Sequence, residues 1–396
     1  MNPLKNPFSP GAGSPPPELA GRQPLLERAK IALVRLKNGK SEKSLLLVGL
    51  RGVGKTVLLN KIHELAESEG FYSVQIEAHE NKSLAALLLP SLRQVLFRLD
   101  RMEKVSEKVK LSFRVLKSFF NGIKMKVHDI EFSLDVDPET GIADSGDIES
   151  DLPALLLTVA EAASDRGAAI VIIIDELQYL TEKEFSALIM SIHKITQKQF
   201  PLVLVGAGLP QLVGLAGRSK SYAERLFDFT VVGPLNDEDA TKALQEPVKA
   251  QKVLFSSEAV DEILSKTKGY PYFIQEWGYH TWNLANESPI NLDSAKSATQ
   301  ESIRRLDESF FRVRFDRLTP KEKKYIRALA ELGPGAHRSG EVAKIFGDKM
   351  QSLSPIRSNL IKKGMIYSPT YGDTEFTVPL FDEFIIRVMP DLDKNP

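Results

Sequence analysis

Apolar positions along the chain follow two patterns: short unbroken runs, and positions spaced by three or four residues. Unbroken runs occur at 45–48, 168–174 and 201–205, and the segment 70–77 alternates apolar with other positions. The spaced pattern predicts helices between these segments, at 84–99, 152–165 and 181–198. Buried runs that alternate with helices are typical of a parallel sheet covered by helices, so we expect an α/β fold over residues 18–235.

After Pro234 the spacing becomes helical, which predicts four helices at 236–251, 257–268, 272–286 and 293–316. A capped helix start at Thr319-Pro320 opens a further unit. We expect helices there at 320–332, 339–346 and 352–363, and then two strands with a hairpin through Gly372 to Val378. The predicted parts are therefore a flexible Pro- and Gly-rich N-terminal arm (1–17), an α/β core (18–235), a helical domain (236–318), a C-terminal domain (319–390) and a tail (391–396).

The first apolar run leads directly into Gly49-x-x-x-x-Gly54-Lys55-Thr56, and helical spacing resumes after it. This is the pattern of a phosphate-binding loop in the strand-to-helix setting that it requires. The glycines let the backbone turn tightly and aim its N–H groups at a phosphate. Lys55 supplies a charge for the β- and γ-phosphates, and Thr56 offers a hydroxyl to Mg²⁺. We expect nucleotide contacts from Gly49, Arg51, Gly52, Val53, Gly54, Lys55, Thr56 and Val57.

The β-branched run 168–174 ends in two carboxylates, Asp175 and Glu176. Two acids at the end of a buried strand are costly unless they face a cation, so we expect both in the same site as the phosphate loop. Asp175 would hold Mg²⁺ through its water shell, together with Thr56, and Glu176 would orient and polarise the attacking water. A purely structural acidic pair is the alternative interpretation.

Composition and charge restrict the classes of partner. The 396 residues carry 52 basic and 52 acidic side chains, so a nucleic acid would have to be bound by a local patch. Cysteine is absent, which excludes disulfides, zinc–thiolate sites and a catalytic thiol, and which fits a cytoplasmic location. No apolar stretch reaches the roughly 18 residues of a membrane span, and the N-terminus lacks the apolar core of a signal peptide.

Residues 101–151 depart from a minimal nucleotide-binding core in their charge distribution. Eight basic residues accompany two acidic ones over 101–128, whereas 129–151 holds nine acidic residues and no basic one. We expect an insertion that contains a solvated amphipathic helix and a hairpin at 123–127 and 130–136. The alternative is a head-to-tail subunit contact or a docking element for a partner.

The phosphate loop and the strand that ends in Asp175-Glu176 resemble those of the AAA+ and STAND P-loop ATPases. The segment Leu19-Ala20-Gly21-Arg22 resembles the entry segment of that family, which implies that these four residues flank the adenine. Gly269-Tyr270-Pro271 resembles the family's Gly-x-Pro motif, which implies that Pro271 contacts the nucleotide at the start of a lid helix. Both segments also suit ordinary helix starts. The order of core, helical lid and winged helix is closest to that of origin-recognition-type initiators.

The same resemblance implies an arginine that reaches the γ-phosphate of a neighbouring subunit. Arg225 is at the matching position, with Arg218 second, and a surface arginine near a helix end is the alternative. An arginine supplied in this way can raise the hydrolysis rate by roughly 10³–10⁵-fold. The family usually has a polar sensor after the strand 201–205, whereas this chain has Gly206-Ala207-Gly208. That departure predicts a low hydrolysis rate without loss of nucleotide binding.

Residues 319–367 carry ten basic and four acidic residues, a net charge of +6 that suits contacts with phosphates. The domain resembles a winged helix-turn-helix with 352–363 as the recognition helix. Candidate contacts to double-stranded DNA through 319–378 are Arg357, Asn359 and Lys362. The predicted hairpin carries Asp373 and Glu375, which DNA would repel. Protein docking or autoinhibition is therefore the competing interpretation.

We expect an ATP-binding and Mg²⁺-dependent ATP-hydrolysing molecular switch, in which lid movement repositions the C-terminal domain. Its expected associates are DNA and a nucleotide-dependent homo-oligomer or partner protein, and its expected catalytic residues are Lys55, Glu176 and Arg225. The choice of ATP over GTP follows from the resemblance alone. The alternative is a slow-turnover signalling or defence scaffold whose winged helix binds protein. A DNA-translocating motor would need a pore loop, and none is visible.

Overall fold

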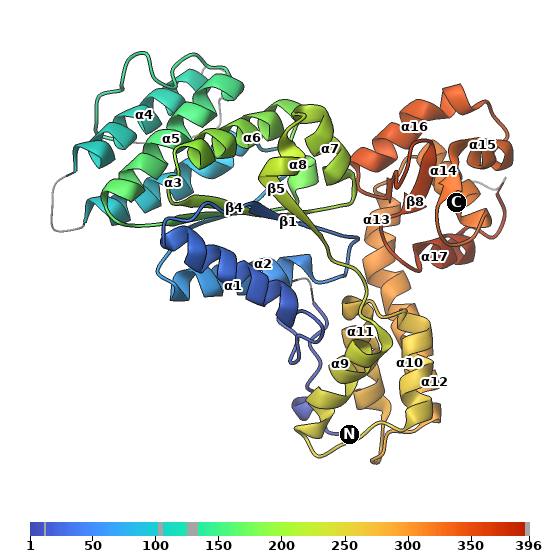
Figure 1. The fold of residues 1–396 in the computed structure, drawn as a ribbon. Coiled ribbons are helices and arrows are strands. Elements are labelled where there is room, and N and C mark those ends of the chain that lie inside the picture. The colour runs from blue at the N-terminus through green and yellow to red at the C-terminus, as the bar shows by residue number, and fades with distance from the viewer. Residues whose placement is uncertain (12, 102–105, 125–133, 393–396) are drawn as a thin grey trace. The chain divides into compact units, whose positions relative to one another are not determined.

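The computed structural model describes residues 1–11, 13–101, 106–124 and 134–392 (Figure 1). The chain forms two compact units. The sheet unit comprises Pro24–Val48 and Lys55–Val231, and the C-terminal unit comprises Met1–Gln23, Gly49–Gly54 and Val232–Pro396. The loop residues 49–54 therefore cluster with the C-terminal unit, although the strand before them and the helix after them belong to the sheet unit.

The sheet unit alternates strands and helices along the chain. Its strands are β1 (Ser44–Val48), β2 (Tyr72–Glu77), β3 (Ile170–Asp175), β4 (Leu202–Gly208) and β5 (Phe227–Val231). Its helices are α1 (Gln23–Lys37), α2 (Lys55–Ser68), α3 (Leu84–Asp100), α4 (Glu107–Lys124), α5 (Ile148–Asp165), the short 3₁₀ helix η2 (Leu177–Tyr179), α6 (Glu182–Gln197), α7 (Gln211–Ser219) and α8 (Ala223–Leu226).

All five strands belong to one sheet with the order β2-β3-β4-β1-β5, and every pairing in it is parallel. The expected α/β fold is thereby confirmed. Val48 pairs with Gly208, and Ile174 pairs with Gly206. Because parallel strands end at the same edge, this register brings together the ends of β1, β3 and β4. The strand β4 is longer than expected and includes Gly206-Ala207-Gly208.

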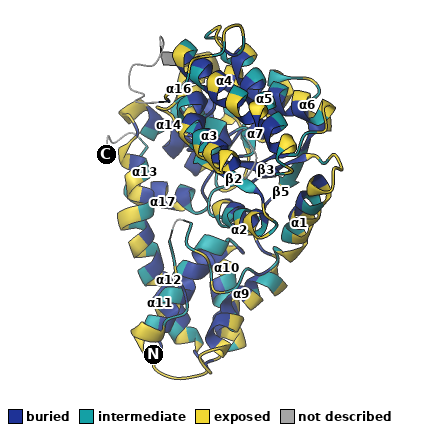
Figure 2. Ribbon diagram, turned by 90° about the vertical axis from the view of Figure 1, so that its left-hand side faces the viewer, coloured by how far each residue is buried: buried dark blue, intermediate teal, exposed yellow. Residues whose placement is uncertain are grey.

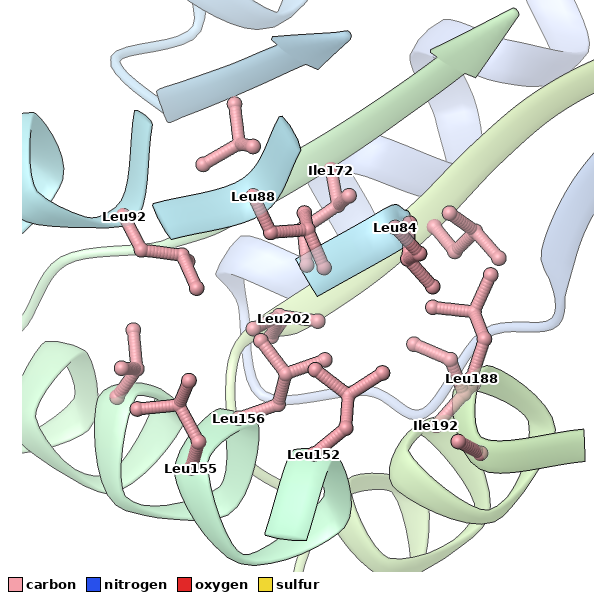
Figure 3. Close-up of a cluster of buried hydrophobic side chains, with 14 of the residues drawn as sticks. Leu84, Leu88, Leu92, Leu152, Leu155, Leu156, Ile172, Leu188, Ile192 and Leu202 are labelled. Carbon is pink, nitrogen blue, oxygen red and sulfur yellow. The ribbon is translucent and has the colours of Figure 1, made fainter. Parts of the chain in front are cut away.

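A leucine-rich core covers one part of this sheet (Figure 3). Leu88 of α3, Leu156 of α5 and Leu188 of α6 belong to one cluster with Ile172 of β3, and all four side chains have no exposed surface. Burying a side chain of this kind contributes about 1.5–3 kcal/mol. Glu184 also joins two of these helices: it closes a capping box with Thr181 at the start of α6 and accepts a hydrogen bond of 2.6 Å from Leu84 N of α3.

The insertion packs on this core through α4, which contacts α5 and α3. Phe119 is fully buried, and Ser118 Oγ donates a 2.6 Å hydrogen bond to the Glu139 carbonyl. Arg114 pairs with Glu139 at 3.0 Å, so a basic residue of the first half meets an acidic residue of the second. The expected hairpin falls largely outside the described residues. Ile123, which was assigned to its first strand, belongs to α4.

The C-terminal unit is mainly helical. Its elements are η1 (Pro3–Lys5), α9 (Asp237–Lys249), α10 (Ser257–Thr267), α11 (Pro271–Leu284), α12 (Leu292–Leu306), the π-helix η3 (Asp307–Phe311), α13 (Arg312–Asp316), α14 (Pro320–Glu331), β6 (His337–Arg338), α15 (Ser339–Phe346), α16 (Met350–Lys362), β7 (Ile366–Tyr367), β8 (Asp373–Phe376) and α17 (Phe381–Val388).

The four helices expected after Pro234 are present as α9 to α12, but the last one differs. A π-helix at 307–311 separates α12 from α13, where a single helix at 293–316 was expected. Beyond it, α14, α15 and α16 pack with an antiparallel sheet in the order β6-β8-β7. This arrangement is consistent with a winged helix. The strand β6 and the helix α17 were not predicted.

The N-terminal segment, which was expected to be a flexible arm, makes specific contacts with α11. Trp282 Nε1 donates a 2.9 Å hydrogen bond to the Asn2 carbonyl, and Asn6 Nδ2 donates one of 3.0 Å to the Tyr279 carbonyl. Phe8 is 3% exposed, and its ring lies against Gly278, where an added Cβ would come within 2.6 Å of it. The segment therefore completes the core of the helical domain.

Burial follows the expected helical pattern, with buried residues on the faces that meet other elements and exposed residues on the outer faces (Figure 2). Among the residues that the structure describes, no helix is both long enough and apolar enough to cross a membrane.

Replacing Phe8 with Ala should destabilise the helical domain, since Phe-to-Ala substitutions in cores cost about 3–5 kcal/mol. Leu4→Ala is the matched control, because Leu4 is 94% exposed. Thermal unfolding of the whole chain should show a clearly lower midpoint for Phe8→Ala and a midpoint close to wild type for Leu4→Ala. Equal midpoints for the two variants would contradict the docking of the segment.

Candidate nucleotide-binding site

The loop 49–54 connects β1 to α2 in a conformation that only glycine adopts easily. Gly52 and Gly54 have φ angles of +83° and +91°. At Gly49, an added Cβ would lie 2.1 Å from the Val232 carbonyl oxygen, so a side chain cannot be accommodated there. Lys55 is the first residue of α2 and is 8% exposed. The first turn of α2 contains no acidic residue that would offset the positive end of its helix dipole.

The two expected metal ligands meet at the carboxyl edge of the sheet. Thr56 Oγ1 donates a hydrogen bond of 2.6 Å to Asp175 Oδ2. Burial raises the pKa of Asp175, whereas the hydrogen bond from Thr56 and the charge of Lys55 lower it. A hydroxyl and a carboxylate oxygen at this spacing are a donor set that fits Mg²⁺, a hard cation that prefers oxygen ligands.

Glu176, the expected base, follows Asp175 in a left-handed backbone conformation with φ +54° and ψ +38°. A non-glycine residue in this region costs about 1–3 kcal/mol and persists only where its surroundings enforce it. Hydrogen bonds to both backbone groups of the residue do so here: Glu176 N donates to Asp175 Oδ1 at 2.8 Å, and the Glu176 carbonyl accepts from Tyr179 N at 3.0 Å. The Glu176 carboxylate accepts a further hydrogen bond from Gln178 Nε2.

The end of β4 explains why the usual polar sensor is missing. An added Cβ at Gly206 would lie 2.3 Å from Leu177 Cδ1 and 2.9 Å from Leu46 Cδ2. At Gly208, it would lie 3.0 Å from Gln178 Oε1. A side chain at position 206 would therefore displace Leu177 or Leu46, and one at position 208 would press on the Gln178 amide and on Leu212. Gln178 was not predicted as a site residue. The one feature of the sequence that could have indicated it is its position two residues after Glu176.

The entry segment lies against the phosphate loop inside the C-terminal unit. The Arg22 guanidinium donates hydrogen bonds to the Val53 carbonyl at 3.2 Å and to the Gly233 carbonyl at 2.5 Å. Burial lowers the pKa of Arg22, and Asp239 opposes that effect. Ala20 is buried, and Leu19 and Gly21 are half-buried. Their contact with an adenine stays a prediction.

The start of the lid helix α11 also contacts the loop. Leu235 N donates a 2.8 Å hydrogen bond to the Gly269 carbonyl, and an added Cβ at Gly269 would lie only 2.2 Å from the Leu235 oxygen. This close approach places Pro271 at the first position of α11. The next residue, Tyr272, donates its N–H to the Gly52 carbonyl at 3.1 Å. The Gly-x-Pro motif and the phosphate loop are therefore neighbours.

The C-terminal domain contacts the loop as well. Arg51 N donates a hydrogen bond of 3.2 Å to the carbonyl of Thr377, which follows β8. Thr377 is fully buried, and its hydroxyl donates a 2.6 Å hydrogen bond to the Gly364 carbonyl, so the segment after β8 is held in place.

Arg225 and Arg218, the two candidates for the arginine acting on a neighbouring subunit, are both exposed, on α8 and α7 respectively. Exposure is what such a role requires. The role itself stays a prediction.

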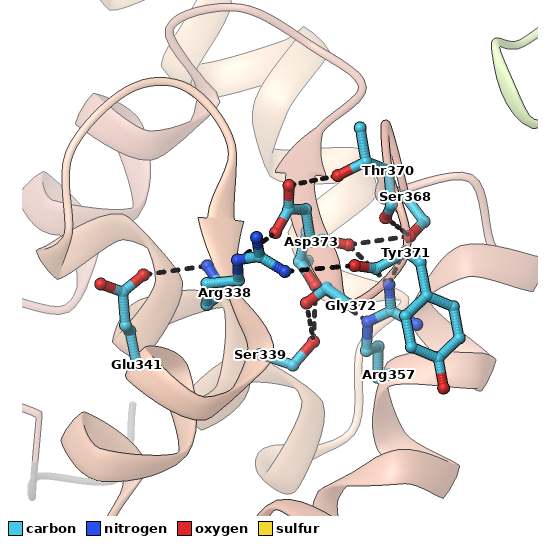
Figure 4. Close-up of polar contacts among 10 residues, drawn as sticks. Arg338, Ser339, Glu341, Arg357, Ser368, Thr370, Tyr371, Gly372 and Asp373 are labelled. Carbon is cyan, nitrogen blue, oxygen red and sulfur yellow. Dashed lines mark hydrogen bonds and ion pairs between the residues drawn. The ribbon is translucent and has the colours of Figure 1, made fainter.

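The candidate DNA contacts do not all lie on the surface. Arg357 donates hydrogen bonds to Thr374 Oγ1 at 2.8 Å, to Ser368 Oγ at 2.9 Å and to the Asp373 carbonyl at 2.6 Å (Figure 4). Its guanidinium therefore joins the β7–β8 hairpin to α16, and its contact with DNA stays a prediction. Asn359 and Lys362 are exposed on α16.

Other basic residues of the domain are also used internally. Arg338 pairs with Asp373 at 3.2 Å, and Lys363 pairs with Glu322 at 2.7 Å. Arg327 is 5% exposed and donates a hydrogen bond to the Met389 carbonyl. The sequence charge of +6 thus overstates the positive charge that a partner would meet.

The fold and the site together define a P-loop ATPase. Residues 18–205 match the AAA ATPase domain family. Residues 308–385 match a second family, a domain of unknown function (DUF8462).

Similar proteins extend over most of the chain. An uncharacterised HTH-type transcriptional regulator of Methanocaldococcus jannaschii is 22% identical over 347 residues, which cover 83% of this chain and 79% of that protein. The Walker-type ATPase of Pyrococcus abyssi is 16% identical, with a TM-score of 0.53 over 93% of this chain and 96% of that one. At this identity the likeness shows the fold alone.

The ORC1 protein of Aeropyrum pernix, solved in complex with DNA, is 16% identical with a TM-score of 0.46 over 95% of this chain and 94% of that one. The resemblance to origin-recognition-type initiators stays a prediction.

Gly206→Ser should destabilise the sheet unit, because the new side chain would force Leu177 or Leu46 to move, and overpacking costs about 1–3 kcal/mol. Gly217→Ala is the matched control: it lies on α7 with nothing within 4 Å of an added Cβ. Thermal unfolding should show a lower midpoint for Gly206→Ser only. An unchanged midpoint would show that β4 can accept a sensor side chain.

Proposed function

We propose that the protein is an ATP-driven molecular switch in which nucleotide bound at the phosphate loop controls the lid and the C-terminal domain. The observation that carries this proposal is the pair of backbone hydrogen bonds made by the loop. Gly52 O accepts from Tyr272 N at the start of the lid helix, and Arg51 N donates to Thr377 O in the C-terminal domain. A change in loop conformation on nucleotide binding would therefore act on both elements.

In this mechanism the loop amides and Lys55 bind the β- and γ-phosphates, and the entry segment Leu19–Arg22 and Pro271 flank the rest of the nucleotide. Thr56 and Asp175 hold Mg²⁺, which neutralises charge on the phosphates when it is bound. Glu176 orients the attacking water and takes up its proton. Arg225 supplies charge to the γ-phosphate of a neighbouring subunit in a nucleotide-dependent homo-oligomer.

Nucleotide can shift the lid only by the difference between its affinities for the two lid positions. The hydrogen bonds at Gly52 and Arg51 supply such a difference, because they join the same backbone segment that must rearrange around a phosphate. Each is a single bond with a net contribution of about 0.5–1.5 kcal/mol, so the switch would be biased rather than locked.

Association with double-stranded DNA is the second part of the proposal. It is supported by the similarity to a protein described as an HTH-type transcriptional regulator and by the exposed positions of Asn359 and Lys362 on α16. Phosphate contacts by Lys362 would add to affinity and to its dependence on salt.

A slow-turnover scaffold whose C-terminal domain binds protein is the second candidate. Two observations favour it: the sensor position on β4 has no side chain, and Arg357 and Arg338 are tied to the hairpin that carries Asp373.

Steady-state ATPase rate, measured against protein concentration with and without duplex DNA, tests the hydrolytic switch. Glu176→Gln should lower kcat by about 10²–10⁴-fold, because it removes the general base, while ATP still binds. Arg225→Ala should abolish the rise of specific activity with concentration, and Arg218→Ala should not. If the wild-type protein is as slow as Glu176→Gln under all conditions, the scaffold is the better account.

A salt titration of duplex DNA binding tests the DNA partner. Lys362→Ala should weaken binding to all sequences and reduce the salt slope by about one, as expected for a lost phosphate contact. Lys296→Ala is the control, since Lys296 is exposed on α12 of the lid. Binding without a salt slope, or an equal effect of both variants, would argue for a protein partner.

A further inference from the structure

Gln178 spans the gap between the ends of β3 and β4. Its Nε2 atom donates a hydrogen bond to Glu176 Oε2, and its Oε1 atom accepts one of 3.0 Å from Leu209 N. It lies on η2, the short helix that connects β3 to α6, and it is half-buried. One side chain thus joins the expected base to the residue that directly follows β4.

The direction of these two hydrogen bonds is determined by their partners. A carboxylate can only accept at neutral pH, and a backbone N–H can only donate. A side-chain amide offers a donor and an acceptor on the same planar end, so Gln178 can make both hydrogen bonds at once. A carboxylate at position 178 would repel Glu176, and an apolar side chain would leave both partners without this contact.

The sheet register shows how close the Gln178 contact to Leu209 N lies to the phosphate loop. Gly208 pairs with Val48, the last residue before the phosphate loop, and β4 lies between β3 and β1. The Gln178 amide, which is hydrogen-bonded to Leu209 N, is therefore held at the end of β4. This strand lies between β3, which ends in Asp175, and β1, which leads into the loop. This is the edge at which the family resemblance implies a polar sensor. On β4 itself, Gly206 and Gly208 carry no side chain, and an added Cβ at 206 would lie 2.3 Å from Leu177 Cδ1.

We propose that Gln178 is a positioning residue that fixes the Glu176 carboxylate relative to the end of β4, in the place of the missing sensor. This inference rests on the proposed hydrolytic function of Glu176. Gln178 does not touch the nucleotide in this account. It selects one orientation of the Glu176 carboxylate.

Kinetics of variants test this role. Gln178→Met keeps the length of the side chain and removes both hydrogen bonds. Its kcat should fall by about tenfold or more, with the KM for ATP and the affinity for ATP within about threefold of wild type. Gln178→Glu keeps the acceptor for Leu209 N and removes the donor to Glu176, and its kcat should fall as far. Gln197→Met, on the exposed end of α6, is the control and should have wild-type kinetics. A kcat for Gln178→Met equal to that of wild type would overturn the proposal.

Thermal unfolding at neutral pH separates failure of this inference from failure of the proposed function, because it needs no hydrolysis. Gln178→Glu sets two carboxylates side by side, so its unfolding midpoint should fall by several degrees. The double variant Glu176→Gln/Gln178→Glu again places an amide beside a carboxylate. Its unfolding midpoint should recover at least half of the fall seen with Gln178→Glu alone. If the protein does not hydrolyse ATP but the double variant recovers stability, the contact stands and the function fails. If the double variant recovers nothing, the inference is wrong whatever the ATPase rate.

Discussion

The parallel register of β1, β3 and β4 is the constraint on which the site depends. It brings Val48, Asp175 and Gly208 to one edge of the sheet, although more than 100 residues separate the first two in the chain. The hydrogen bond between Thr56 and Asp175, at 2.6 Å, exists only because α2 starts and β3 ends at that edge. Burial of β-branched and leucine side chains on both faces of these strands stabilises the sheet that holds this edge together.

Close packing at the same edge determines which residues can act. Glycine at 206 admits Leu177, and glycine at 208 admits the Gln178 amide. These two positions of β4 therefore carry no polar side chain, and the Gln178 side chain of η2 lies at the end of β4 instead. The low hydrolysis rate predicted from the missing sensor depends on how well Gln178 performs that task, so packing and catalysis cannot be separated at this site.

The parts of the site that follow from local sequence could be predicted. The phosphate loop and the acidic pair have fixed spacing next to an apolar strand, and that pattern also indicated the parallel sheet. Contacts that depend on tertiary packing could not be predicted. Gln178 has no motif of its own, and nothing in the sequence shows that Arg357 faces the hairpin rather than the solvent. The positive charge of the C-terminal domain was counted correctly, but its pairing with Asp373, Glu322 and backbone carbonyls appears only in three dimensions.

The proposed switch requires that nucleotide at the loop changes the arrangement of the lid and the C-terminal domain, the two elements that the loop contacts. Because the chain has no cysteine, Lys296→Cys on α12 and Lys344→Cys on α15 would give two specific positions for spin labels. Pulsed electron spin resonance would measure the distance between them in a Glu176→Gln background, without nucleotide and with Mg²⁺ and ATP. We predict that ATP shifts the distance distribution and that adding Lys55→Ala abolishes the shift. An unchanged distribution at saturating ATP, with binding confirmed on the same sample, would contradict the account.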